Sequence, residues 1–243
     1  MGNEIDIQQQ QRDCEDDEEA EEPSDLDADR GVVRSILFHD TIESTRPAPP
    51  IPLMLADTMG NAGDEGAGAA PVVESSAERY RGPVFRVRTD LLRYADGHRF
   101  ACDVVEHPGS VAVAAMLGER ALLLVRQYRH PLRATMWEIP AGKCEAGELP
   151  LEGAARELAE ETGYRAARFE LLASVAMTPG FCDEVLHLVL ARDLTAGLQS
   201  LDEDERIDVR AVTLDEGMAM IARGEIADAK TVLAFLWLQN DAR

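Results

Sequence analysis

The chain has 243 residues, of which 45% are hydrophobic and 29% are charged, and its formal net charge is −22. This size and composition are typical of a soluble protein with one large domain or two small ones. The negative charge argues against nucleic acid as a partner, because it would repel phosphate backbones, and no apolar run approaches the roughly 20 residues that cross a bilayer.

The first 78 residues differ in composition from the remainder. They contain 20 Asp and Glu against 4 Lys and Arg, a charge of 4 − 20 = −16, which leaves −22 + 16 = −6 for residues 79–243. Their Gln, acidic, Pro and Gly/Ala runs cannot bury enough apolar surface to offset the entropy of ordering the chain. We therefore expect a disordered acidic extension over residues 1–78, either a dispensable tail or an interaction arm. A third possibility is that the chain normally starts later, at Met54 or Met59.

The globular part is expected to open with a small antiparallel unit over residues 79–108. Its two strands, 83–89 and 100–105, flank an Asp-Gly turn at 96–97. The segments 111–116 and 121–127 follow as a hairpin of strands that are apolar enough to lie in a core.

A helix is predicted over residues 150–162, because Pro150 stands at its start and Gly163 at its end. Further strands are predicted at 170–176, 185–191 and 207–212. Thr213 and Glu216 have the spacing of a capping box that opens a helix closed by Gly224, and a last helix covers 228–239. This order predicts an α/β domain over residues 109–243, with a mixed sheet between helices.

The segment 142–164 carries the most informative side chains. Glu157, Glu160 and Glu161 are spaced three and four residues apart, so they share one face of the predicted helix. Crowded carboxylates destabilise a bare helix, but they suit a hard divalent cation such as Mg²⁺ or Mn²⁺. A solvated helix face is the alternative, which is disfavoured because no Lys or Arg stands four residues from Glu157. Arg156 is placed to hold Glu148 or a member of the cluster.

The same segment resembles the Nudix box, Gly-x5-Glu-x7-Arg-Glu-U-x-Glu-Glu-x-Gly-U, in which U is apolar. The pattern is filled by Gly142, Glu148, Arg156, Glu157, Leu158, Glu160, Glu161, Gly163 and Tyr164. The resemblance implies a Nudix-type α/β/α sandwich and metal-dependent hydrolysis of a nucleoside diphosphate linked to another group. It also implies that the metal ligands are Glu157, Glu160, Glu161 and the backbone oxygen of Ala141.

Similarity over roughly residues 80–240 resembles the ADP-ribose pyrophosphatase branch of that family. The pieces that carry it are Pro179 and the segments HPGSVAV, LVRQYRH, WEIPAGK, TPGFCDE and GEIADAKT. This implies hydrolysis of ADP-ribose to AMP and ribose 5-phosphate. The alternatives are ADP-sugars or other nucleoside diphosphate compounds as substrates, and a ligand-binding regulator without turnover, which the intact box disfavours.

The branch resemblance also implies roles for residues outside the box. Arg129 would contact the substrate phosphates, and Glu138 would contact the terminal ribose or the surroundings of the phosphates. The structural alternatives are a surface cation for Arg129 and a satisfied turn carboxylate for Glu138. Glu184 is the candidate general base, in competition with Asp183 and with the box glutamates, among them Glu160.

One position departs from the branch, whose members often carry Arg-Glu where this chain has Cys102-Asp103. Arg99 is three residues too early to replace that Arg, because it would point to the opposite face of a strand. Relatives in the branch form homodimers through N-terminal strands, so residues 79–108 are expected to mediate a homodimer. The four cysteines form no Cys-x-x-Cys pair, which is typical of a reducing cytoplasm. Since the N-terminus also lacks the features of a secretory signal, a soluble cytoplasmic protein is expected.

Overall fold

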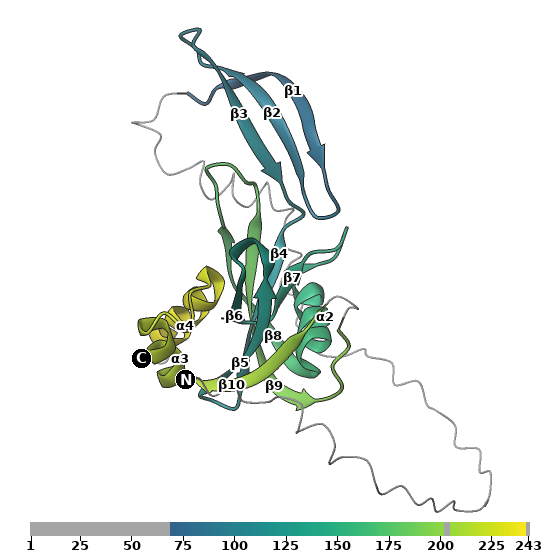
Figure 1. Ribbon diagram of the computed structural model, residues 1–243, viewed down its shortest axis with the longest axis vertical. Coiled ribbons are helices and arrows are strands. Elements are labelled where there is room, and N and C mark those ends of the chain that lie inside the picture. The colour runs from purple at the N-terminus through teal and green to yellow at the C-terminus, as the bar shows by residue number, and fades with distance from the viewer. Residues whose placement is uncertain (1–68, 202–204, 242–243) are drawn as a thin grey trace, which may run out of the picture. The chain divides into compact units, whose positions relative to one another are not determined.

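A computed structural model describes the chain over residues 69–201 and 205–241. The first sheet is antiparallel, in the order β1-β2-β3 (Figure 1), and its strands are β1 (Val72–Arg81), β2 (Arg86–Arg93) and β3 (Arg99–Glu106). The Asp-Gly turn predicted between two strands joins β2 to β3, where Gly97 has a φ of 90° and its N–H donates to the oxygen of Tyr94. Most of the predicted acidic extension, residues 1–68, lies outside the described residues.

The N-terminal sheet starts at Val72 and not at the predicted boundary of residue 79, so the assignment of residues 72–78 to the extension is wrong. The backbone of β1 pairs with β2 from Val72, opposite Arg93, to Arg81, opposite Arg86. Every residue of β1 is exposed. The strand therefore has no buried face, and it lacks the apolar alternation by which a strand is found in a sequence.

The second sheet has seven strands and carries the predicted site. The strands are β4 (Ser110–Leu117), β5 (Ala121–Arg129), β6 (Ala134–Glu138), β7 (Ala141–Lys143), β8 (Tyr164–Ala176), β9 (Val185–Ala196) and β10 (Ile207–Thr213). Their order is β10-β5-β4-β9-β8, with β6 beside β5 and β7 beside β4. Since β4 and β9 are parallel and the other pairs are antiparallel, the predicted mixed sheet is confirmed.

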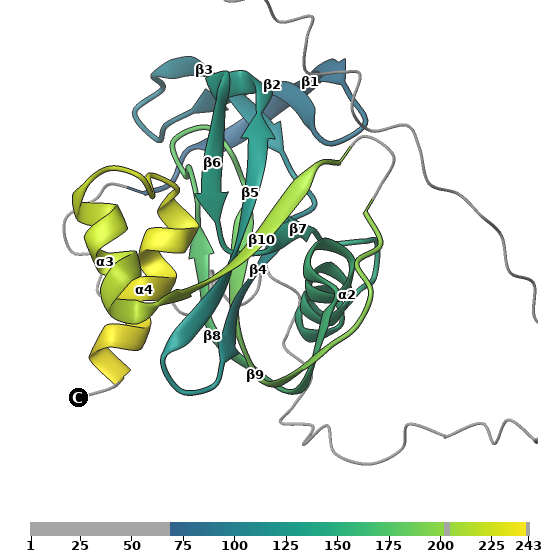
Figure 2. The ribbon, with the colours of Figure 1, turned by 60° about the horizontal axis from the view of Figure 1, so that its bottom comes forward.

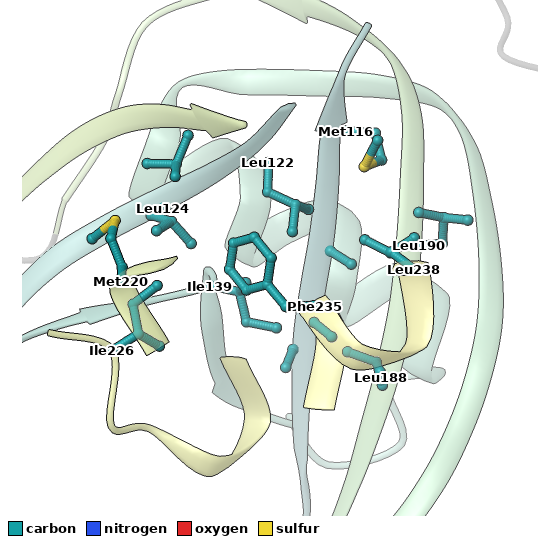
Figure 3. Close-up of a cluster of buried hydrophobic side chains, with 14 of the residues drawn as sticks. Met116, Leu122, Leu124, Ile139, Leu188, Leu190, Met220, Ile226, Phe235 and Leu238 are labelled. Atoms are coloured by element: carbon teal, nitrogen blue, oxygen red, sulfur yellow. The ribbon is translucent and has the colours of Figure 1, made fainter. Parts of the chain in front are cut away.

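Helices cover both faces of this sheet (Figure 2). One face packs on α2 (Pro150–Thr162), and the other packs on α3 (Leu214–Ala222) and α4 (Ala229–Asp241). Along β4, Val113 and Ala115 join Leu158 of α2 in one core, whereas Ala112 and Ala114 join the other core, around Phe235 of α4 (Figure 3). This alternation follows from the two-residue period of a strand, and it confirms the α/β/α sandwich.

Several element boundaries differ from those predicted. The helix over 150–162 is confirmed residue for residue, but the predicted strands 170–176 and 185–191 are only the C-terminal part of β8 and the N-terminal part of β9. The remaining parts, 164–169 and 192–196, carry exposed polar residues, so their sequences lack the apolar pattern that predicts a strand. Oγ1 of Thr213 accepts from the N–H of Glu216 at the start of α3, at 3.2 Å, which is the N-cap half of the predicted capping box. Within the described residues, no helix is long and apolar enough to cross a bilayer.

We expect Gly217→Ala to destabilise the domain by about 1–3 kcal/mol, because an added Cβ would overlap the ring of Phe235. Phe235 is 1% exposed and packs in a core of buried side chains. The destabilisation would occur although alanine favours a helix more than glycine does. Urea unfolding measures it, with Gly180→Ala as the control, since a Cβ on Gly180 meets nothing within 4 Å. Equal stability of Gly217→Ala and the wild type would contradict the packing argument.

Candidate active site

The short strand β7, between β6 and α2, is built around a residue without a side chain. Gly142 pairs with Val111 of β4, and an added Cβ on Gly142 would overlap the carboxylate of Glu157. The small side chain of Ala154, which is fully buried, lets α2 lie close to the sheet. Because Gly142 has no side chain, the carboxylate of Glu157 can lie directly against β7.

Two of the three helix carboxylates are buried. Glu157 is 9% exposed and Glu161 is 3% exposed. Burial raises the pKa of Glu161 to about 8, although its oxygen accepts a hydrogen bond of 3.0 Å from the N–H of Ala141. Burial also raises the pKa of Glu157, against the opposing effect of Arg156. Carboxylates that are buried at this cost are typical of functional sites.

Arg156 joins the box carboxylates into one network. Its Nε and Nη2 donate to the two oxygens of Glu148, at 2.9 and 3.0 Å. Its Nη1 donates to Glu157 at 2.8 Å and to Glu160 at 3.0 Å. A planar guanidinium with five N–H donors can make these bonds together, which an ammonium group cannot do. The hydrogen bonds from Arg156 also hold the pKa of Glu148 below its usual value.

The chemistry of this donor set fits a divalent cation. Glu157, Glu160 and Glu161 offer hard carboxylate oxygens within one turn of α2, and the contact between Ala141 and Glu161 places the residue of the predicted carbonyl ligand beside them. In the part of the chain that the structure describes, no three acidic, His or Cys side chains converge as a ready-made metal site. The hydrogen bonds explain this, since Arg156 engages Glu157 and Glu160 while Glu161 turns to the backbone.

A second charged cluster surrounds Glu138, at the end of β6. Its carboxylate accepts from Nε and Nη2 of Arg129, both at 2.8 Å, and from Nζ of Lys230, at 2.5 Å. Burial would raise the pKa of Glu138, but Arg129 and Lys230 outweigh this effect and hold it below its usual value. Glu138 is 2% exposed, so it is placed to orient Arg129 and is poorly placed to contact a substrate. Sequence reasoning did not single out Lys230, although the segment GEIADAKT that contains it was part of the resemblance.

Glu184 directly precedes β9, and its carboxylate contacts residues that flank the start of β4. Its Oε1 accepts a hydrogen bond of 2.7 Å from Ser110 and lies 3.9 Å from Nδ1 of His107. That nitrogen already accepts from the N–H of Gly109, at 3.2 Å, so the firm partner of Glu184 is Ser110. Among the described residues, no hydrogen bond or ion pair joins Glu184 to Glu157, Glu160 or Glu161.

The loop before Glu184 is fixed to the N-terminal sheet. The N–H of Val105 in β3 donates to the oxygen of Phe181, at 2.7 Å, and the oxygen of Val105 accepts from the N–H of Asp183, at 3.1 Å. A cavity of about 300 Å³ lies beside this contact and is lined in part by Phe85, His107 and Asp183. This volume is at the lower end of the range for small-molecule sites.

Arg99 does not compensate for Cys102. It lies on β3 with the opposite orientation to Cys102, as the strand period requires, and its Nε pairs with Glu74 at 2.9 Å. Cys102 pairs through the backbone with Asp90 of β2. Cys102, Cys144 and Cys182 are all free thiols.

Comparison with known proteins shows which families and relatives the chain is similar to. The family model described as "NUDIX domain" matches residues 106–235. The "Methanol dehydrogenase activator" of Bacillus methanolicus is 43% identical over 162 residues, which cover 66% of this chain and 88% of that protein. The "ADP-ribose pyrophosphatase" of Bacillus subtilis is 40% identical over 162 residues, with the same coverage.

Two further similarities agree with these matches. The "ADP-ribose pyrophosphatase" of Mycobacterium tuberculosis is 34% identical over 165 residues, which cover 67% of this chain and 80% of that protein. Among solved structures, the "Crystal structure of ADP compounds hydrolase" superposes with a TM-score of 0.65 and 23% identity, over 74% of this chain and all of that one. The last similarity concerns the fold.

Proposed function

The chain belongs to the Nudix family, and we propose that it hydrolyses the pyrophosphate bond of ADP-ribose to give AMP and ribose 5-phosphate. It is a Nudix pyrophosphohydrolase of the ADP-ribose and ADP-sugar type. The observation that carries the proposal is the buried carboxylate face of α2, where Glu157 and Glu161 keep acidic side chains in a place that disfavours their charge. Hydrolysis of another ADP-sugar is the alternative within the same type.

The residues of the site have distinct roles in this proposal. Nudix hydrolases generally need divalent metal ions, and here Glu157, Glu160, Glu161 and the oxygen of Ala141 would hold Mg²⁺ or Mn²⁺. A bound divalent cation supplies positive charge against the pyrophosphate oxygens. Arg129 adds a guanidinium that stabilises charge on the phosphoryl group. Arg156 fixes Glu148, Glu157 and Glu160 relative to one another.

The first test is AMP release from ADP-ribose in the presence of Mg²⁺, with ADP-glucose and NADH as comparison substrates. The fastest cleavage is expected for ADP-ribose. Faster cleavage of ADP-glucose would show that the reaction is the proposed one but that the substrate is an ADP-sugar. Cys102, where the branch often carries Arg, would then be the first position to mutate. Absence of hydrolysis of all three compounds, with either Mg²⁺ or Mn²⁺, would contradict the proposed activity.

A second candidate is the regulation of another enzyme, which the similarity to the "Methanol dehydrogenase activator" favours. In that case the chain would bind a partner protein and alter its rate. The candidates are separated by adding this protein to a purified alcohol dehydrogenase, with and without the substitution Glu161→Gln. Activation that survives the substitution would favour a binding function that is independent of turnover.

We expect Glu184→Gln to lower kcat for ADP-ribose by about 100-fold, because general-base catalysis contributes at least that much. The amide still accepts the hydrogen bond from Ser110 but cannot take a proton from water. Ser110→Ala leaves the carboxylate and removes only its 2.7 Å hydrogen bond, so a smaller loss, about 10-fold, is expected from misplacement. If Glu184→Gln keeps wild-type kcat, the base is another carboxylate, and Glu160 is then the first to test.

We also propose that the chain forms a homodimer through its N-terminal sheet. Val72, Val73 and Tyr80 of β1 are each more than half exposed, and β1 pairs with β2 as the last strand of its sheet. An edge strand with exposed apolar residues is prone to pair with another chain. Light scattering would test this, and a monomeric mass would contradict it. The cytoplasmic location and the absence of a nucleic-acid partner stay predictions.

A further inference from the structure

Arg129 is held by Glu138 on one side of its guanidinium only. Nε and Nη2 both donate to the carboxylate, in the parallel geometry of a bidentate pair. The Arg129 side chain is 37% exposed, whereas Glu138 is 2% exposed. Nη1 of Arg129 therefore makes no hydrogen bond to Glu138 and is directed elsewhere. Its direction depends on the position of the Glu138 carboxylate, which holds Nε and Nη2.

The Glu138 carboxylate is fixed in turn by the first turn of α4. Nζ of Lys230 donates to Oε2 of Glu138 at 2.5 Å and to Oδ1 of Asp228 at 3.0 Å. Lys230 is 12% exposed. Two cations and two carboxylates thus alternate in a row, Arg129, Glu138, Lys230 and Asp228, and their formal charges cancel.

The same turn of α4 also holds the residue after Glu138. Thr231 is fully buried, and its Oγ1 accepts from the N–H of Ile139 at 2.8 Å while it donates to Asp228 at 2.5 Å. The N–H of Thr231 also donates to Asp228, at 3.0 Å. The start of α4 therefore contacts two consecutive residues: the side chain of Glu138, which ends β6, and the backbone N–H of Ile139, which follows it.

Lysine is rare in this chain. Of its 24 cationic residues only Lys143 and Lys230 are lysines, so 24 − 2 = 22 are arginines. The side chain of a lysine ends in a compact ammonium with three N–H donors. Lys230 bridges Glu138 and Asp228 through its single ammonium group.

We propose that Lys230 is a positioning residue for catalysis, which fixes the phosphate-binding guanidinium of Arg129 by holding Glu138 from the opposite side. This rests on the proposed function, since it assumes that Arg129 contacts the substrate phosphates. Without the ammonium of Lys230, Oε2 of Glu138 would lose one of its two hydrogen-bond donors. The carboxylate could then rotate, and the guanidinium of Arg129 would change its orientation with it.

A double-mutant cycle on kcat/KM for ADP-ribose tests the proposal. Lys230→Met is expected to lower kcat/KM by about 10-fold in the wild-type background and by less than about 2-fold in the Arg129→Met background. The control is Arg223→Met, which removes an exposed cation near α3 that pairs with Glu216 and Glu225, and it should keep wild-type kcat/KM. Equal losses in both backgrounds would overturn the proposal, because Lys230 would then act independently of Arg129.

A second measurement does not depend on turnover. Protein labelled with ¹³C and ¹⁵N in lysine gives two side-chain signals, which the variant Lys143→Arg assigns. The Lys230 signal is expected to shift in both Glu138→Gln and Arg129→Met, and to stay in place in Arg223→Met. An unmoved signal in Arg129→Met would overturn the coupling even in an active enzyme. If the wild type does not cleave ADP-ribose but the signal shifts, the proposed function fails while the coupling of Lys230 to Arg129 stands.

Discussion

Replacement of Glu161 by Gln is expected to lower kcat for ADP-ribose on the order of 1,000-fold, because a metal ion contributes several kcal/mol to such a reaction. The amide oxygen of Gln can still accept the 3.0 Å hydrogen bond from Ala141, so the turn and the helix should stay in place. The negative charge that attracts a divalent cation is lost. Steady-state kinetics across a range of Mg²⁺ concentrations measure both the loss and any weakening of metal binding.

The same substitution is expected to change how stability depends on pH. In the folded protein the pKa of Glu161 is about 8, against an ordinary value of 4.5. Between these values the folded state binds more protons than the unfolded state, so this group makes the protein less stable as pH rises from 4.5 to 8. Glu161→Gln removes that contribution. Urea unfolding in EDTA at pH 5.5 and pH 8 should therefore show a smaller fall for Glu161→Gln than for the wild type.

The control for both measurements is Glu119→Gln, which neutralises an exposed carboxylate in the turn between β4 and β5. It should keep the activity and the pH dependence of the wild type. If Glu161→Gln also keeps full activity, Glu161 is not part of the catalytic machinery. A variant that is inactive because it has unfolded would be recognised by its circular dichroism.

The parts of the site that the sequence predicts are those with local signals. Pro150 and Gly163 mark the ends of α2, and the structure places the helix between them. The spacing of the glutamates within that helix determines that they share a face, whatever the helix packs against. The continuous apolar run 111–116 likewise predicts a strand that lies in a core, and the structure shows that its two faces belong to different helical layers.

The parts that the sequence does not predict depend on contacts between distant segments. Lys230 and Glu138 are 92 residues apart, and Ser110 and Glu184 are 74 apart. No spacing rule connects such positions. The sequence therefore indicates Glu138 and Glu184 as candidates but does not indicate their partners, Lys230 and Ser110. The exposed strand β1 is missed for a different reason, since it is held by backbone hydrogen bonds and its side chains carry no pattern.

Arg156→Met is expected to destabilise the domain by about 3 kcal/mol, because it leaves partly buried carboxylates without their shared cation. Glu148 and Glu157 have side chains that are 13% and 11% exposed, so water cannot fully replace the guanidinium. kcat should also fall by at least about 100-fold, since Glu157 and Glu160 would repel each other out of their common orientation. Urea unfolding and steady-state kinetics measure the two effects.

The matched control is Arg168→Met, which removes an Arg of β8 paired with Asp193, where the two side chains are 68% and 55% exposed. That pair is solvated, so its loss should leave the free energy of unfolding nearly unchanged. Mg²⁺ is expected to restore part of the stability of Arg156→Met and to have no comparable effect on Arg168→Met, because a divalent cation can take over the role of the guanidinium among Glu157 and Glu160. Equal stability of the two variants without Mg²⁺ would contradict this view, and the carboxylate face of α2 would then be stable without a cation.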